Sequence, residues 1–219
     1  MSEDARDSPK ENNVFADIVK QLAQSFVPNE VQAPTIKPET LKLFAEKMSE
    51  KGYEMTEASL KILNEYLKGY NLWLCGNVGV GKTFFFTCMS RVRKARGLSP
   101  IVKLSMIETQ GWTMEDASEW ARDVEDYDVL IDDVGAEPML NHYGEKVEVF
   151  PYLLEKRMRI SGQRTHLTSN LGPTDILKRY ERRVADRFAQ MFKMVEMKCK
   201  KSRRKLTLWK RPEGSEVVL

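Results

Sequence analysis

Residues 76–83 read GNVGVGKT, and they lie between a short apolar run and a stretch with the spacing of a helix. The segment fits the pattern G-x-x-x-x-G-K-[ST], which requires a strand before it and a helix after it. Backbone N–H groups in such a glycine-rich turn and at a helix N-terminus bind the α and β phosphates of a nucleotide. By the same pattern, Lys82 meets the β and γ phosphates, and the Thr83 hydroxyl ligates Mg²⁺. The predicted nucleotide-binding residues are Gly76, Asn77, Val78, Gly79, Val80, Gly81, Lys82, Thr83 and the adjoining Phe84.

Downstream of this motif, short apolar runs alternate with helical stretches, which is the pattern of a parallel sheet covered by helices. The fold class that this pattern predicts is α/β, a P-loop NTPase with three layers in which helices cover both faces of a central parallel sheet. The predicted strands are residues 72–75, 101–105, 128–132, 165–169 and, at an edge of the sheet, 193–197.

Helices are expected wherever apolar residues recur every three or four positions between these strands. The predicted helices are residues 84–96, 114–122, 147–160 and a pair within 173–192. Pro151 must either start or kink the helix at 147–160. Upstream of the motif, Leu41, Phe44 and Met48 indicate one more helix, and Thr56 is expected to cap another at 57–68.

Polar residues lie at the ends of two of the predicted strands. Asp132 and Asp133 lie at the end of the third strand, and Asn170 lies at the end of the fourth. Ligands gather at the carboxyl ends of strands in α/β sheets, so these side chains are expected beside the phosphates. We interpret Asp132 as the carboxylate on the Mg²⁺ side. Asp133 would orient the attacking water, with a side chain one methylene shorter than Glu. Asn170 is interpreted as a sensor of the γ-phosphate or the lytic water, and a helix cap or turn residue is the alternative.

Composition excludes several classes of protein. Hydrophobic residues make up 42% and charged residues 31%, which rules out a fibrous or wholly disordered chain. No run approaches the roughly 18 apolar residues of a spanning helix, and the polar N-terminus does not resemble a signal peptide. We therefore expect a cytoplasmic protein with no membrane partner. The three cysteines match neither a disulfide framework nor a zinc site, and we expect Cys75 and Cys88 in the core.

The chain divides into three parts. Residues 1–37 are expected to be a disordered segment and linker with one amphipathic helix at about 14–26, which either packs on the body or binds a partner. Residues 38–197 form the predicted nucleotide-binding domain with its preceding helices. Residues 198–219 are a basic tail, because 198–211 hold eight Lys or Arg and no acid in a chain of net charge +3. This tail suits a polyanion partner, and the alternative is a solvated segment.

Four segments together resemble a known family. GNVGVGKT, VLIDDVGAE, THLTSN and YERRVADRF are similar, in order and spacing over roughly residues 58–197, to the AAA+ ATPases of the helicase-loader group, of the DnaC and DnaI type. The transposition helper IstB is a relative of this group. The resemblance implies that Asn170 is sensor 1 and that Arg187 is an arginine finger that reaches the ATP of a neighbouring subunit. Arg183, on the same helix face, looks like a second phosphate-sensing arginine, and a surface salt-bridge partner is the alternative.

The resemblance also implies an activity and partners. They are binding and slow hydrolysis of ATP with Mg²⁺, assembly into a homo-oligomer through the trans arginine, and contacts with single-stranded DNA and a replicative helicase. A transposition helper that binds duplex DNA and a transposase is the first alternative. A non-hydrolysing ATP-dependent adaptor and a small-molecule kinase are the others. Only 49 residues follow Asn170, so the full helical lid of most AAA+ proteins is not expected, and residues 1–37 lack a Cys or His cluster for zinc.

Overall fold

The computed structural model of this chain describes residues 37–142, 145–180 and 182–198. A five-stranded sheet lies at the centre, in the order β2-β3-β6-β1-β7, and each neighbouring pair of strands is parallel. This confirms the predicted parallel sheet, with its last strand at an edge. The strands are β1 (Leu72–Cys75), β2 (Val102–Ser105), β3 (Val129–Val134), β6 (Thr165–Ser169) and β7 (Lys193–Glu196).

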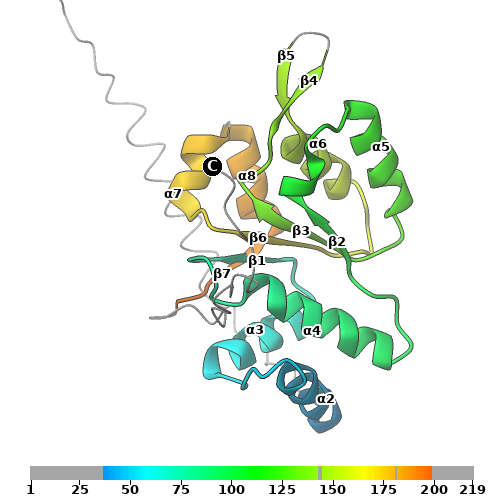
Figure 1. The fold of residues 1–219 in the computed structure, drawn as a ribbon, viewed down its shortest axis with the longest axis vertical. Coiled ribbons are helices and arrows are strands. Elements are labelled where there is room, and N and C mark those ends of the chain that lie inside the picture. Colours follow the sequence, from blue (N-terminus) through cyan, green and yellow to red (C-terminus); the bar gives the residue numbers. More distant parts are fainter. Residues whose placement is uncertain (1–36, 143–144, 181, 199–219) are drawn as a thin grey trace, which may run out of the picture.

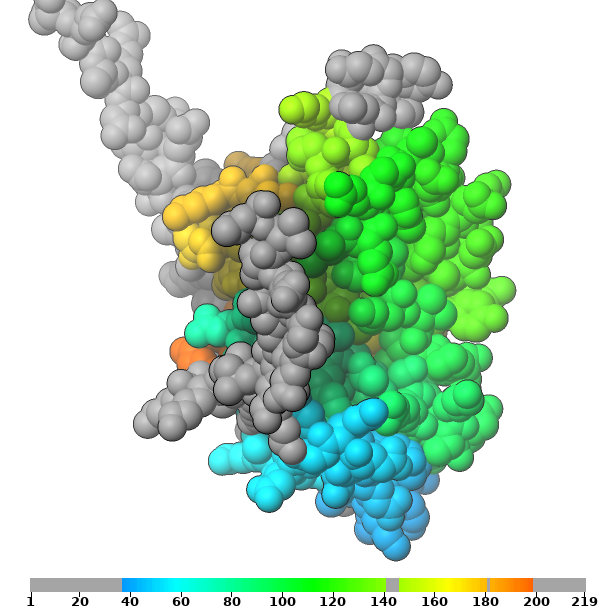
Figure 2. Space-filling view, viewed as in Figure 1, coloured from blue at the N-terminus to red at the C-terminus, as the bar shows by residue number. Residues whose placement is uncertain are grey.

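Helices cover both faces of this sheet (Figure 1). One face carries α2 (Pro38–Ser49), α3 (Glu57–Leu67) and α4 (Lys82–Ala95). The other carries α5 (Met114–Asp123), α6 (Val149–Met158), α7 (Pro173–Arg179) and α8 (Arg182–Met191). In the space-filling view, the blue and cyan residues of α2 and α3 form one end of the described body (Figure 2).

Each face of the sheet has its own apolar core. Successive side chains of a strand point to opposite faces, and in β1 they supply both cores. Leu72 and Leu74 pack in the cluster under α2, α3 and α4, whereas Trp73 and Cys75 pack under α5, α6 and α8. Because all four are buried, β1 is covered on both sides, as expected for a central strand of a parallel sheet. Cys75 and Cys88 are both buried free thiols, as predicted.

Local sequence explains where the helices begin. Thr56 and Thr113 each form a capping box, in which the hydroxyl accepts the N–H three residues ahead and that residue's side chain accepts the threonine N–H. Pro151 lies in the first turn of α6, where its missing N–H costs no helical hydrogen bond. Helix α4 begins at Lys82, two residues before the predicted start, so the end of the GNVGVGKT motif is the first turn of the helix.

A β-hairpin, β4 (Met139–His142) and β5 (Glu145–Glu148), follows β3 and corrects the sequence prediction. Residues 147 and 148, predicted to be helical, belong to β5, and α6 begins at Val149. The two strands pair antiparallel with each other and form a separate sheet that projects from the body (Figure 1).

The predicted helix at 14–26 and the basic tail beyond residue 198 lie outside the described residues. Among the helices that the structure describes, none combines the length and apolarity needed to cross a bilayer.

Candidate nucleotide-binding site

The GNVGVGKT loop connects β1 to α4 through backbone conformations that require glycine. Gly81 is the N-cap of α4 and has φ 103°, a left-handed conformation that a residue with a Cβ rarely adopts. Gly76 has φ 138°, and a Cβ there would lie 2.2 Å from the Met197 carbonyl oxygen at the end of β7. The loop therefore fits against β7 only because its first residue has no side chain.

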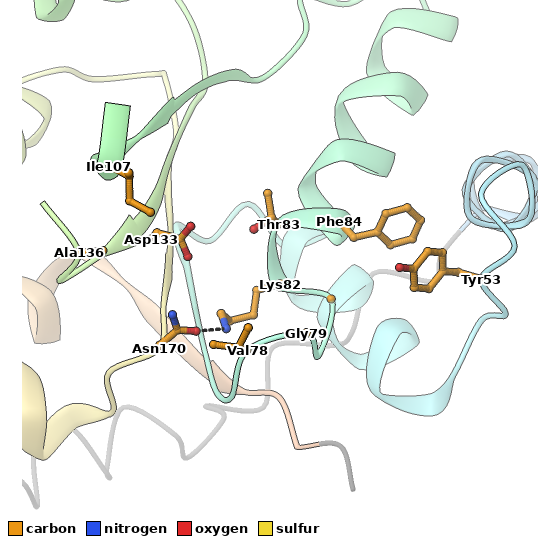
Figure 3. Close-up of a pocket in the computed structure, with 11 residues that line it drawn as sticks. Tyr53, Val78, Gly79, Lys82, Thr83, Phe84, Ile107, Asp133, Ala136 and Asn170 are labelled. Atoms are coloured by element: carbon orange, nitrogen blue, oxygen red, sulfur yellow. Dashed lines mark hydrogen bonds between the residues drawn. The ribbon is translucent and has the colours of Figure 1, made fainter. Parts of the chain in front are cut away.

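Lys82 lies at the centre of the loop. Its ammonium donates hydrogen bonds to the carbonyl oxygens of Gly76 and Asn77, at 2.7 and 3.0 Å, and to Asn170 Oδ1 at 2.8 Å. The Asn170 contact joins the first turn of α4 to the end of β6, two segments 88 residues apart in the chain. Lys82 and Asn170 thus lie side by side, as the sequence analysis expected for groups around one γ-phosphate (Figure 3).

The two predicted Mg²⁺ ligands also meet. Thr83 Oγ1 donates to Asp132 Oδ1 at 2.7 Å, and the Thr168 hydroxyl donates to the same carboxylate oxygen. Lys103 Nζ lies 3.5 Å from the other oxygen of Asp132, which is almost completely buried. A hydroxyl and a carboxylate are the hard oxygen ligands that Mg²⁺ takes. In the part of the chain that the structure describes, no group of three or more His, Cys, Asp or Glu side chains forms a metal site. A magnesium ion held here therefore needs phosphate and water as its remaining ligands, which is its usual coordination beside a nucleotide.

Asp133 has an unusual backbone. Its φ is 59°, and it is the one residue other than glycine with positive φ in the described chain. The register between β3 and β6 shifts between Ile131 and Val134, and the Asp133 N–H donates to Thr168 Oγ1 at 3.0 Å. Asp tolerates the left-handed region better than most residues. The Asp133 side chain therefore departs from the alternation of side chains along β3 and lines the pocket.

A pocket of about 420 Å³ lies over the loop (Figure 3). It is lined by Tyr53, Val78, Gly79, Gly81, Lys82, Thr83, Phe84, Ile107, Asp133, Ala136 and Asn170. Of the predicted nucleotide-binding residues, Gly76, Asn77 and Val80 do not line it. Gly76 and Asn77 act through the carbonyls that hold Lys82, and Val80 is buried in the core beneath α4.

Tyr53 is a pocket residue that the sequence analysis missed. Its ring stacks on Phe84, with centroids 4.1 Å apart and planes at 28°. Tyr53 lies between α2 and α3, and no motif marks it, because the contact arises only when these helices pack against α4. Ile107 and Ala136 line the pocket too and were not predicted as site residues. Ile107 comes from the 3-10 helix η1 (Met106–Thr109) after β2, and Ala136 from the segment after β3.

Arg183 and Arg187 lie away from this pocket. Both are on α8, and no pocket-lining residue comes from α6 or α8. Both guanidinium groups pair with Glu155 of α6. The structure thus brings Lys82, Thr83, Asp132, Asp133 and Asn170 together around the motif, and it does not bring either arginine to them.

Comparisons with known proteins agree with this fold. No protein-family model matches the sequence, and no curated protein matches it significantly. Among solved structures, AMPPCP-bound DnaA from Aquifex aeolicus is similar, with a TM-score of 0.50 and 20% identity over 72% of this chain and 52% of that one. A DnaC helicase loader has a TM-score of 0.49 and 14% identity over 74% and 100% of the two chains. DnaI has a TM-score of 0.47 and 20% identity over 79% and 95%.

The chain spans about half the length of the DnaA structure that it matches. The sheet order, the helices on both faces and this likeness confirm the predicted fold class, the three-layer α/β fold of a P-loop NTPase. This is the fold that the resemblance to the AAA+ ATPases of the DnaC and DnaI type implies. No lid domain is present among the described residues.

Proposed function

We propose that this chain is an AAA+ ATPase that binds Mg·ATP, hydrolyses it slowly and acts as a helicase loader in DNA replication. The contact between the Thr83 hydroxyl and the Asp132 carboxylate carries this proposal, because it joins the two Mg²⁺ ligands expected of a P-loop NTPase across 49 residues of sequence. The Lys82 contact with Asn170 supports it, since both groups would face the γ-phosphate. The proposed location is the cytoplasm.

Each side chain has a distinct part in the proposed reaction. The loop N–H groups and Lys82 bind the phosphates, and the carbonyls of Gly76 and Asn77 hold the ammonium in place. Thr83 and Asp132 hold Mg²⁺, which when bound supplies positive charge beside the phosphate oxygens. Asp133 orients the attacking water. Asn170 contacts the γ-phosphate or that water without adding charge.

Slow turnover follows from Asp133. Positioning and charge stabilisation are nearly all that a protein contributes to phosphoryl transfer. The Asp133 carboxylate is one methylene shorter than that of Glu, and it projects from a left-handed backbone position at a register shift of the sheet. The shorter side chain therefore reaches less far into the pocket than that of Glu would. The homo-oligomer implied by the sequence resemblance would add the trans arginine, Arg187, to raise this rate.

The proposal that the chain is a helicase loader rests on the residues of two sequence segments. VLIDDVGAE and THLTSN are closest to the helicase loaders, and the basic tail suits single-stranded DNA. The proposed partners are therefore a replicative helicase, single-stranded DNA and further copies of this chain.

Nucleotide binding through Lys82 is the first prediction. We expect Lys82→Ala to abolish detectable Mg·ATP binding in titration calorimetry, because it removes the cation that faces the phosphates. The control is Lys94→Ala, which removes an exposed lysine from the last turn of the same helix and should bind like the wild type. Circular dichroism should show that both variants are folded. Equal ATP affinity of Lys82→Ala and the wild type would refute the assignment of the site.

A further inference from the structure

Two arginines on α8 converge on a single carboxylate oxygen. Arg183 Nη2 lies 3.1 Å from Glu155 Oε1, and Arg187 Nη1 is paired with the same Oε1. The four-residue spacing places both arginines on one face of the helix, and Glu155 faces them from α6. Two guanidinium groups that meet at one oxygen form an anion site, and here a side chain of the same protein supplies the anion.

A phosphate oxygen could take the position of that carboxylate oxygen. Guanidinium groups bind phosphate and carboxylate with the same planar donor geometry. Each arginine has five N–H donors, so one shared carboxylate oxygen satisfies only part of what the pair offers. The Arg183 side chain is 71% exposed and that of Glu155 is 34% exposed. The pair with Arg183 is therefore weak and exchanges readily, whereas the Arg187 side chain is 18% exposed and its pair with Glu155 is the firmer of the two.

The phosphate would have to come from another molecule. None of the residues that line the nucleotide pocket comes from α6 or α8, so the arginines do not face the nucleotide of their own chain. Figure 1 places α6 and α8 on the sheet face opposite α3 and α4. Within the described residues, Glu155 is the one acidic side chain that pairs with Arg183 or Arg187.

We propose that Glu155 is an intramolecular latch, which occupies Arg183 and Arg187 until the nucleotide phosphates of a second copy of this chain displace it. This inference rests on the proposed function, because the displacing anion is the ATP bound by a neighbouring subunit. Each subunit then keeps both arginines paired with one carboxylate while it is alone. Assembly exchanges one carboxylate for the more highly charged phosphates.

The latch stays charged in ordinary buffers. The hydrogen bond from Arg187 is the largest influence on Glu155, and the charges of Arg187, Arg183 and Arg159 act in the same direction, so together they lower the pKa of this carboxyl. Acidification to mild pH therefore leaves the carboxylate in place. Competition by phosphate, and not protonation, is what opens the latch.

The test measures ATPase rate per subunit against protein concentration. Glu155→Gln keeps the size of the side chain and removes its charge, so a neighbour's phosphates no longer compete with a carboxylate. We expect the protein concentration for half-maximal rate to fall about two- to tenfold, since each exposed ion pair contributes little. Glu155→Asp keeps the charge and should stay closer to the wild type. The matched control is Glu50→Gln, which removes a carboxylate paired with Lys47 and Arg91 at α2 and α4, on the other face of the sheet.

Two further measurements separate the possible failures. ATP affinity measured at low protein concentration reports the proposed function alone, and it should be the same in Glu155→Gln and the wild type. If the affinity is normal while the half-maximal concentration of Glu155→Gln is unchanged or higher, the latch is refuted and the ATP site stands. In a background that carries Arg183→Ala and Arg187→Ala, Glu155→Gln must also leave the concentration dependence of assembly unchanged, as measured by sedimentation velocity. A shift that persists there would place the effect outside the two arginines and overturn the proposal.

Discussion

At the scale of single residues, Asp132 and Asp133 are adjacent in sequence but differ in burial. Asp132 is buried and accepts hydrogen bonds from the hydroxyls of Thr83 and Thr168. Asp133 lines the pocket from a left-handed backbone position. Alternation along the strand alone would send two successive side chains to opposite faces. The left-handed backbone at Asp133 changes this alternation, and Asp133 lines the pocket next to the buried Asp132.

This difference predicts two distinct phenotypes. Asp133→Asn should bind ATP normally and fail to hydrolyse it, because the amide cannot take a proton from water. Asp132→Asn should instead weaken the dependence of binding and rate on Mg²⁺. Asn tolerates the left-handed region as Asp does, so the first substitution leaves the backbone unstrained. The measurements are ATP titrations at several Mg²⁺ concentrations and single-turnover hydrolysis. Wild-type rates in both variants would make the two acids ordinary strand-end residues.

At the scale of secondary-structure elements, His166 connects strand β6 to strand β1 inside the core. It lies on β6, fully buried between the rings of Tyr66 and Phe86, and its Nδ1 accepts the Leu72 N–H of β1 at 3.1 Å. Burial is the main cause that holds the pKa of His166 well below its usual range, and the nearby charges of Arg164 and Arg93 act in the same direction. The imidazole is therefore part of the core structure.

A pH dependence of stability follows from His166. The unfolded chain takes up a proton below about pH 6.5, whereas the folded chain does not. The free energy of unfolding should therefore fall as pH drops below about 6.5, by up to about 1.4 kcal/mol per pH unit from this group. His166→Asn retains an acceptor near Nδ1 and should flatten that slope. Urea unfolding at pH 5 to 7.5 provides the measurement, with His166→Gln as a second variant.

Carboxylates titrate equally in the wild type and in both histidine variants, so the difference between the curves reports His166. If the wild type and a folded variant have parallel curves, the buried imidazole does not govern the acid side of the stability profile.

The elements also show what the sequence could and could not predict. The strands of the main sheet were found because burial on both faces leaves continuous apolar runs such as LWLC. The β4–β5 hairpin was missed because it lies outside the main sheet, and its pairing depends on antiparallel contact between two four-residue strands. Tyr53 was missed because its contact with Phe84 depends on how α2 and α3 pack on α4. Lys82 and Thr83 of the motif line the pocket because the glycine-rich loop sets their positions, whereas Gly76, Asn77 and Val80 do not line it.

At the scale of the whole molecule, the nucleotide pocket and the Arg183–Arg187 pair occupy different surfaces of one subunit. If the arginines of one copy serve the ATP of the next, the contact joins unlike surfaces. Such a heterologous contact forms closed rings or open helical filaments, whereas a twofold contact would join like surfaces. The proposed oligomer is therefore a ring or a helix, and each of its nucleotide sites is completed by α8 of a neighbour.

The final prediction concerns the basic tail, residues 198–219. Deleting it should weaken the affinity for single-stranded DNA and flatten its salt dependence, because each cation that neutralises a phosphate contributes about 0.7 to the slope. The deletion leaves β7 intact, since this strand ends at Glu196 and the Met197 N–H still bonds to the Cys75 carbonyl. Trp209→Ala should reduce affinity by about 1 to 3 kcal/mol and keep the salt slope, because stacking on an unpaired base does not depend on counterions.

Fluorescence anisotropy with a single-stranded oligonucleotide and with its duplex, over a range of salt concentrations, tests this prediction. Because stacking on Trp209 requires unpaired bases, a loader should prefer the single strand through its tail. A transposition helper would prefer the duplex, so the ratio of the two affinities also separates the proposed function from its first alternative. Unchanged affinity after the deletion would remove the tail from DNA binding. The site would then have to be sought around Ser105 to Thr113, where Trp112 offers an aromatic face but no residue carries a positive charge.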